Sequence, residues 1–413
     1  MIANALRGVP VPGSQVLTAS RVPLYAYAIA ATYAAFLVSV FTAGTWIVDA
    51  KGVPVYTDFT SQWIGAVQAA HGRAESLYEP NKFVAAQASL AGQSDFFYPN
   101  WPYPPTYLLV LVPFTVFPYL FAFVGWETAT LVGCIGVIYG IVRRPAAIPL
   151  VLAWPYSAWN LLAGQNGFLT ASLLGAGLFL LKRKPVLAGV FIGGLTYKPQ
   201  FGLLLPVALL ATGLWPAVAS AATTAVLLAA ASAVAFGAGV WISFPRQLLS
   251  QTGLNLFADA DSAWGYLQTV YGLVRSLHGG AAVAWLAQGL ATLAAAVLVW
   301  SVWRSAAAFS LKAAILSAAT IIATPCAFAY DMATIVVPAA FLVRDQLQRG
   351  FLKGEQLVIT GLFLGLVALL VFLRDPPQGI VFGSLPIAPL ILITVLTLAL
   401  RRLRYRESEV VLQ

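Results

Sequence analysis

Long apolar runs recur along this chain, and they limit the folds that it can adopt more than any other feature. Two of them, residues 119–142 and 281–303, exceed the roughly 20 residues that a helix needs to cross a bilayer. Only 9% of the residues are charged, against about 25% in a soluble domain. Lipid cannot satisfy free backbone groups, so only helices or closed barrels cross it, and long apolar runs exclude a barrel. The sequence therefore predicts an all-α, polytopic integral membrane protein, with residues 1–413 as one domain.

The apolar runs predict about twelve transmembrane spans. They are residues 24–46, 119–142, 146–161, 167–181, 186–198, 202–213, 217–241, 281–303, 310–325, 330–348, 356–373 and 383–402. Residues 186–198 and 202–213 would be only about 18 Å long as helices, which is shorter than the ~30 Å hydrocarbon core of a bilayer. Such short spans indicate a site that is recessed into the membrane and open to one leaflet.

The basic residues favour one orientation in the membrane. Sixteen of the 23 lysines and arginines fall on one side of the predicted spans and seven on the other. Cytoplasmic loops carry an excess of Lys and Arg, so both termini are predicted to be cytoplasmic. The net charge of +9 is then a signal of topology rather than of nucleic-acid binding.

Two long segments are predicted to lie on the external side. The first, residues 47–118, contains DFTSQWIGAVQAAHG, which has the pattern of a helix lying on the membrane surface. Its last part, residues 106–118, is broken by Pro113 and is predicted to insert only halfway into the membrane. The second external segment is residues 242–280.

Several kinds of chemistry lack their usual motifs in this sequence. There is no Walker loop, so nothing indicates ATP hydrolysis. Cys134 and Cys326 both lie in apolar segments, and we interpret them as small core residues rather than as a disulfide or metal ligands. No group of Cys and His has the spacing of a zinc site. We therefore predict no cofactor, and we do not predict a requirement for metal.

Four stretches of the chain resemble glycosyltransferase family 87 in their order and spacing. They are YTDFTSQW, YPPTYLLVLVP, GQNGFLTASLLGAGLFLLKRKPVLAGVFIGGLTYKPQFGLLLP and TPCAFAYDMATIVVP. Enzymes of this family are polyprenol-phosphate-mannose-dependent α-mannosyltransferases with the GT-C membrane fold. The resemblance implies a GT-C-type helical bundle that takes a sugar from a lipid-phosphate carrier on the outer face. It also implies a catalytic carboxylate in the first external segment, where this chain has Asp58.

Asp58 is the candidate general base. A sugar hydroxyl that attacks an anomeric carbon must lose its proton, and a carboxylate within hydrogen-bond reach can accept it. The leaving polyprenyl phosphate is already anionic, so one carboxylate is enough, unlike the pair in a glycosidase. A single direct displacement would invert the anomeric configuration. The alternative interpretation of Asp58 is a helix N-cap.

Two basic residues are candidates for the phosphate of the donor. Lys198 lies between two short spans, where a lysine either snorkels to the interface or pairs with an anion. The leaving phosphate would be its natural partner. Arg275 is predicted to be external and near the membrane, where its planar fork would suit phosphate. The alternative for Arg275 is an ordinary surface arginine.

Four further residues are candidates for binding the sugar. Tyr330 and Asp331 follow Pro325 at the external entrance of a predicted span, and they would line the sugar pocket. Asp331 would equally suit the cap of a new helix. The amides of Gln165 and Asn166 would bind sugar hydroxyls, or would serve only the turn in which they lie.

Together these features predict an inverting membrane glycosyltransferase, and the family resemblance makes it a mannosyltransferase. Its partners would be a polyprenyl-phosphate sugar donor, a glycolipid or lipid-linked glycan acceptor and membrane lipids. It would act at the external face of a bacterial inner membrane and would bind no nucleic acid. The alternative is a secondary transporter or a lipid flippase, which would place charged groups near the bilayer midplane and have two similar halves. A lipid-linked polysaccharide polymerase or ligase is a third possibility, but it would need a longer late external loop. The gathering of polar residues at one face favours the glycosyltransferase.

Overall fold

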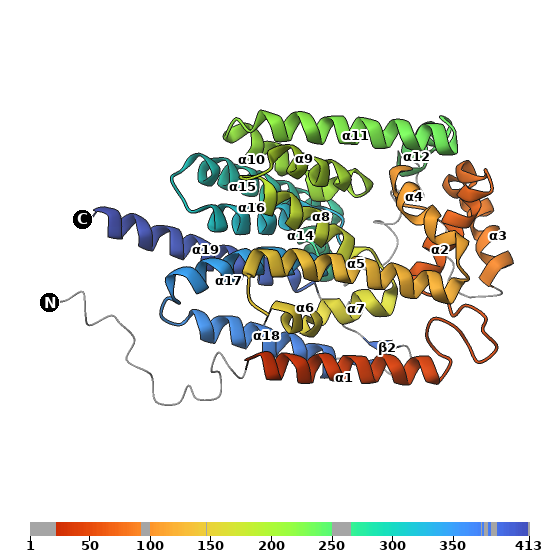
Figure 1. Cartoon of the computed structure of the whole chain (residues 1–413), viewed down its shortest axis with the longest axis horizontal. Helices are drawn as coiled ribbons and strands as arrows, with labels where there is room; N and C mark the ends of the chain where they lie inside the picture. Colours follow the sequence, from red (N-terminus) through yellow and green to blue (C-terminus); the bar gives the residue numbers. More distant parts are fainter. Residues whose placement is uncertain are drawn as a thin grey trace.

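Helices make up nearly the whole of the structure (Figure 1). The computed structural model describes residues 22–91, 100–145, 147–249, 266–372, 374–375, 379–380 and 386–411. Within these ranges the strands are β1 (Arg374–Asp375) and β2 (Gly379–Ile380), which pair antiparallel. The predicted all-α fold class is confirmed. The predicted cytoplasmic tail before residue 22 lies outside the described residues.

Among the described residues, four helices are long and apolar enough to cross a membrane. They are α1 (Val22–Thr42), α5 (Tyr119–Val142), α11 (Trp215–Phe236) and α15 (Ala281–Arg304). Large apolar side chains on α11 and α15 point outward, including Val234, which is 88% exposed, and Leu293, which is 62% exposed. Apolar surface of this extent suits lipid rather than water. The membrane character of the chain is thus confirmed, and the number of twelve spans stays a prediction.

The other predicted spans form further helices, most of which are shorter than these four or divided. They are α6 (Ala147–Ala153), α7 (Pro155–Ala163), α8 (Gly167–Leu180), α9 (Pro185–Gly194), η4 (Leu195–Tyr197), η5 (Pro199–Gly202), α10 (Leu205–Ala211), α16 (Phe309–Ala323), η7 (Ala329–Ile335), α17 (Val336–Arg349), α18 (Glu355–Phe372) and α19 (Ala388–Val411). The predicted span 146–161 is divided between α6 and α7. Pro155 lacks a backbone N–H and stands at the start of the second helix, where that loss costs least.

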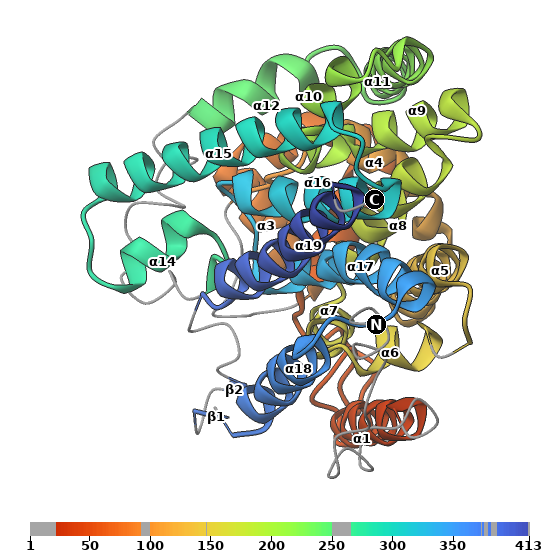
Figure 2. The same cartoon turned by 90° about the vertical axis from the view of Figure 1, so that its left-hand side faces the viewer.

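Helix α16 lies at the centre of the bundle. Helices α15, α17 and α19 pack around it (Figure 2), and twelve of its 15 residues are buried. Many of the buried residues are Ala or Ser, which allow neighbouring helices to approach closely. The apolar core around α16 also takes in residues of α5, α8 and α9.

A buried ionic group joins three helices at the end of the bundle that contains the C-terminal part of α19. Arg402 on α19 donates from Nε to Asp345 Oδ2 at 2.8 Å and from Nη1 to Glu355 Oε2 at 2.6 Å. Its Nη2 also donates to the carbonyl of Gly350 at 2.8 Å. Both carboxylates are fully buried, and Arg402 is 4% exposed. The single Arg402 guanidinium therefore donates to acceptors on α17, on α18 and in the turn between them.

The first predicted external segment folds into a group of short helices at one end of the molecule (Figure 1). They are α2 (Asp58–Ala70), η2 (Ala74–Tyr78), α3 (Pro80–Ala91), α4 (Thr106–Leu111) and η3 (Val112–Val116). The first of these, which was predicted to lie on the membrane surface, is covered mostly by protein. Nine of the 13 residues of α2 are buried, because α2 packs against η2, α3, α4 and η3.

The second predicted external segment joins the same group. Helix α12 (Val240–Leu249) packs on η2, and the rings of Tyr78 and Phe244 have centroids 5.8 Å apart. Residues 250–265 of this segment lie outside the described residues. The two segments that were predicted to share one side of the membrane therefore meet at one end of the bundle.

Candidate functional site

Asp58 begins helix α2 and is not its N-cap. The cap is Thr57, whose backbone is extended (φ −131°, ψ 172°). The N–H of Thr57 donates to Thr60 Oγ1 at 2.9 Å, as in a capping box. The interpretation of Asp58 as the N-cap is therefore wrong. Its half-buried carboxylate contacts a distant part of the chain instead.

Gln165 links Asp58 to Tyr103. Its Nε2 donates to Asp58 Oδ2 at 3.0 Å, and its Oε1 accepts from the Tyr103 hydroxyl at 3.1 Å. The amide is buried, whereas Asp58 is only half-buried. Because the nitrogen and the oxygen of this buried amide are both hydrogen-bonded, the amide holds the Asp58 carboxylate in a fixed orientation.

The turn that carries Gln165 requires two glycines. Gly164 ends α7 in the left-handed region (φ 69°), and a Cβ there would lie 2.5 Å from atoms of both Phe59 and Phe123. Gly167 begins α8, and a Cβ there would overlap the backbone carbonyl of Tyr330. The turn between α7 and α8 is therefore pressed between α2 on one side and η7 on the other.

Lys198 and Asp331 form a buried ion pair beside this turn. Lys198 Nζ lies 2.5 Å from Asp331 Oδ1, and the two residues are 4% and 1% exposed. Asp331 Oδ2 also accepts from the N–H of Phe328 at 3.0 Å, so the same carboxylate caps η7. The alternative that Lys198 snorkels to the interface is wrong, because its ammonium is buried on an acidic partner.

Two tyrosine rings surround the ammonium of Lys198. The ring centroid of Tyr330 is 4.9 Å from Nζ and that of Tyr103 is 5.9 Å from it, within the range of cation–π attraction. Burial and the negative charges of Asp331 and Asp58 raise the pKa of Tyr103. Its hydroxyl therefore remains a hydrogen-bond donor at neutral pH. Tyr103 lies between the two acidic groups and connects them into one site.

Gln62 and Tyr107 also belong to the site, and neither was predicted from the sequence. Gln62 follows Asp58 by one helical turn and donates from Nε2 to the carbonyl of Gly164 at 3.2 Å. The Tyr107 hydroxyl donates to Gln62 Oε1 and accepts from Asn166 Nδ2 at 3.1 Å. The four-residue spacing of Asp58 and Gln62 indicates that they share a face of the helix. The sequence does not show which part of the chain packs against that face.

Glu127 supports the same turn from inside the bundle. It is buried on α5, and its Oε2 accepts from Asn160 Nδ2 at 3.3 Å. Asn160 also donates to the carbonyl of Gln165 at 3.0 Å, and its Oδ1 accepts from the N–H of Gly167 at 2.8 Å. Asn160 therefore holds both ends of the turn, and Glu127 holds Asn160.

Six of the seven predicted site residues form one connected group, and Arg275 stands apart from it. The six are Asp58, Gln165, Asn166, Lys198, Tyr330 and Asp331. Arg275 lies on α14 (Val270–Ser276), and its Nη1 donates to the carbonyl of Gly279 at 3.1 Å, which closes the turn after that helix. Within the described ranges, no group of three or more His, Cys, Asp or Glu residues is placed to hold a metal ion.

Four of the six residues of the connected group, all but Asp58 and Asp331, fall within a known family pattern. The model of glycosyltransferase family 87 matches residues 101–330, which is more than half of the chain. The chain belongs to glycosyltransferase family 87. It is therefore a membrane glycosyltransferase, as the sequence resemblance implied. No curated protein and no solved structure matches the chain.

The family match includes Tyr103, Gln165, Lys198 and Tyr330, but it begins after Asp58. The contact between Asp58 and Gln165 joins α2 to the matched region. In a glycosyltransferase, such a group has the parts that sugar transfer needs. It contains a half-buried carboxylate that can accept a proton and a buried ammonium that can stabilise negative charge.

Proposed function

We propose that this family 87 enzyme transfers a sugar, mannose, from a polyprenyl-phosphate donor to a glycolipid or lipid-linked glycan, with inversion at the anomeric carbon. The observation that carries the proposal is the contact of Asp58 with Gln165 beside the buried pair of Lys198 and Asp331. The arrangement supplies one proton acceptor and one fixed cation. A direct displacement by an acceptor hydroxyl on an anionic leaving group needs these two functions.

The two carboxylates of the site differ in their capacity to act as a base. Asp331 is 1% exposed, and its two oxygens accept from Lys198 and from the N–H of Phe328. Both of its oxygens are therefore occupied by donors inside the protein. Asp58 is half-buried and is held by a neutral amide. This difference supports Asp58 as the base that takes the proton of the acceptor hydroxyl.

Lys198 is the proposed electrostatic partner of the donor phosphate. Asp331 and the tyrosine rings hold its ammonium in place, so its charge needs no reorganisation when the phosphate leaves. A donor phosphate that approaches the site would share this ammonium with Asp331. Arg275 remains a proposed second contact to the phosphate, made by α14.

Tyr330 is proposed to line the sugar site, because it is half-buried and its ring covers the ammonium of Lys198. Aromatic rings offer apolar faces to the C–H groups of a sugar. Gln165 and Asn166 contribute mainly by orienting Asp58 and Tyr107, since both amides are buried. On the proposed topology, the site faces the exterior of a bacterial inner membrane and both termini are cytoplasmic.

The proposal is tested by transfer from defined donors. Purified enzyme in lipid is incubated with radiolabelled polyprenyl-phosphate mannose, polyprenyl-phosphate glucose or GDP-mannose, together with extracted glycolipid acceptors. We expect labelled glycolipid from polyprenyl-phosphate mannose alone, with the opposite anomeric configuration to that of the donor. Transfer from GDP-mannose would disprove the polyprenyl-phosphate donor class, and transfer from the glucosyl donor would disprove mannose as the transferred sugar. Retention of the anomeric configuration would disprove the single displacement.

A further inference from the structure

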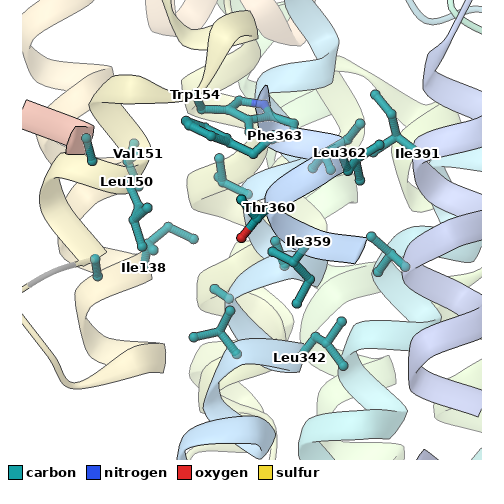
Figure 3. A pocket seen from close by; sticks show the side chains of 18 of the residues that line it. Ile138, Leu150, Val151, Trp154, Leu342, Ile359, Thr360, Leu362, Phe363 and Ile391 are labelled. Atoms are coloured by element: carbon teal, nitrogen blue, oxygen red, sulfur yellow. The ribbon is translucent and has the colours of Figure 1, made fainter. Parts of the chain in front are cut away.

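An apolar cavity of about 530 Å³ lies between α1, α5, α6, η7, α17, α18 and α19, and no residue of the candidate active site lines it (Figure 3). Its volume is in the range of small-molecule binding sites. Leu150 and Val151 line one side, and Leu342 and Ile359 line another, with the Thr360 hydroxyl between them. The lining is otherwise almost wholly apolar, so the cavity suits a hydrocarbon chain rather than a sugar.

The cavity reaches the lipid-facing surface of the bundle. Two of its lining residues, Tyr25 on α1 and Leu364 on α18, are 40% and 54% exposed. A chain from the surrounding bilayer can therefore enter between the helices without crossing polar protein.

Three arginines gather where the cavity ends. Val142 and Val343 line the cavity, and Arg143 and Arg344 follow them directly in the sequence. Arg344 donates from Nη1 to the carbonyl of Ile141 at 3.2 Å, which fixes its guanidinium at the last turn of α5.

Arg143 and Arg183 lie near enough to Arg344 to repel its charge. In the part of the chain that the structure describes, none of these three arginines forms an ion pair with Asp or Glu. Asp345, the next residue after Arg344, is buried on Arg402 and on the Ser310 hydroxyl. No carboxylate in the described ranges therefore compensates the positive charge at this end of the cavity.

This end of the bundle is opposite to the candidate active site. The hydroxyls of Tyr119, at the start of α5, and of Thr60, on α2, share a hydrogen bond of 2.8 Å. Arg143 follows the other end of this 24-residue helix, which corresponds to about 36 Å. The arginines therefore lie at the membrane surface on the far side of the protein from Asp58.

We propose that this cavity and the three arginines bind an anionic glycerophospholipid from the leaflet opposite to the active site. The phosphate would lie on Arg143, Arg183 and Arg344, since the planar guanidinium suits phosphate oxygens. One acyl chain would fill the cavity. The bound lipid would connect α1 and α18 to the rest of the bundle, because both helices line the cavity from the periphery.

Native mass spectrometry of the full-length enzyme in detergent tests the proposal. Dioleoyl phosphatidylglycerol and dioleoyl phosphatidylcholine are titrated separately. We expect one tightly retained phosphatidylglycerol and weaker retention of phosphatidylcholine. The double variant Arg143→Asn, Arg344→Gln should lose at least about ten-fold in phosphatidylglycerol affinity, because it removes charge-assisted contacts. Asn tolerates the left-handed backbone of Arg143 (φ 56°).

Two matched controls separate this site from general lipid binding. Arg304→Gln removes a charge at the end of α15, which is not among the elements that line the cavity, and it should retain wild-type affinity. Ala339→Phe fills the cavity and should weaken binding, whereas Ala230→Phe on the exposed face of α11 should not.

Four results would overturn the proposal. They are equal retention of both phospholipids, full affinity in the double arginine variant, full affinity in Ala339→Phe, and displacement of the lipid by glycerol 3-phosphate at a similar concentration. The last result would show a site for a free anion. A fifth result, displacement by polyprenyl phosphate that is lost in Ala339→Phe, would also overturn the proposal, because it would assign the cavity to the chain of the donor.

Discussion

Gln165 donates a hydrogen bond to the carboxylate of Asp58 over 3.0 Å, although the two residues lie 107 positions apart in the sequence. The same amide accepts from Tyr103, which borders the ion pair of Lys198 and Asp331. The position of Asp58 therefore depends on a turn between two other helices. The orientation of the carboxylate can be disturbed without changing Asp58 itself.

Gln165→Ala should lower the turnover number about ten- to hundred-fold, because a hydrogen bond to a charged group contributes roughly 1.5–3 kcal/mol. The KM for the donor should change little, since Gln165 orients the base and does not hold the phosphate. Steady-state kinetics with a saturating acceptor would measure both. Asn81→Ala, on the exposed side of α3, is the control. An unchanged turnover number in Gln165→Ala would show that Gln165 does not position Asp58 for catalysis.

Lys198→Met should destabilise the protein by about 3–5 kcal/mol, because it leaves the Asp331 carboxylate buried without a cation. The double variant Lys198→Met, Asp331→Leu should recover most of the thermal stability, since it removes both charges. It should still transfer no sugar, because the proposed phosphate partner is gone. Thermal unfolding in detergent and a transfer assay would be measured on the same preparations. Wild-type transfer by the double variant would make the ion pair purely structural.

Much of the fold could be predicted from apolar runs alone. The predicted spans 119–142 and 281–303 coincide with α5 and α15 to within one residue. Hydropathy could not reveal that α2 is buried, because an amphipathic pattern shows only that one face is apolar. Whether lipid or protein covers that face depends on segments distant in the sequence, here η2, α3, α4 and η3.

The candidate site was predictable only as separate residues. Lys198 was singled out because a charge near the membrane is costly, and Asp58 and Asp331 because they lie in stretches that resemble the family. Their pairing was not predictable, since Lys198 and Asp331 are 133 positions apart. Tyr103 was one of many aromatic residues near predicted interfaces, and composition alone could not separate it from an interfacial belt.

Arg402→Met should destabilise the folded protein by about 3–5 kcal/mol, because Glu355 would remain buried without a cation and Asp345 would keep only the exposed Arg349. Arg401→Met, at an exposed neighbouring position, is the matched control and should unfold at the wild-type temperature. Protein that remains folded should transfer sugar normally, since this ionic group joins α17, α18 and α19 and does not touch the site. Unfolding followed by intrinsic fluorescence would measure the difference. Equal stability of the two variants would show that this ionic group contributes nothing.

The proposed topology predicts which cysteines react from outside the cell. A cysteine at Lys82, exposed on α3, should react with an impermeant maleimide in intact spheroplasts. A cysteine at Lys184, exposed before α9, should react only after permeabilisation. Labelling is read by mass shift on gels, with the unsubstituted chain as background for its own Cys134 and Cys326. The reverse pattern would place Asp58 on the cytoplasmic side and refute the external site.

Asp58→Asn should reduce transfer by at least about a hundred-fold, because general-base assistance is typically worth 10²–10⁴ in rate. Asparagine keeps the size of the side chain and can still accept from Gln165, so folding and membrane insertion should be normal. Donor binding should be retained, since the base contacts the acceptor and Lys198 the phosphate. Glu79→Gln changes an exposed acid of the same segment, paired with Lys82, and should leave transfer unchanged. The decisive measurement is the initial rate with monodisperse protein. A rate near that of the wild type would mean that Asp58 is not the base, and that another group takes the proton.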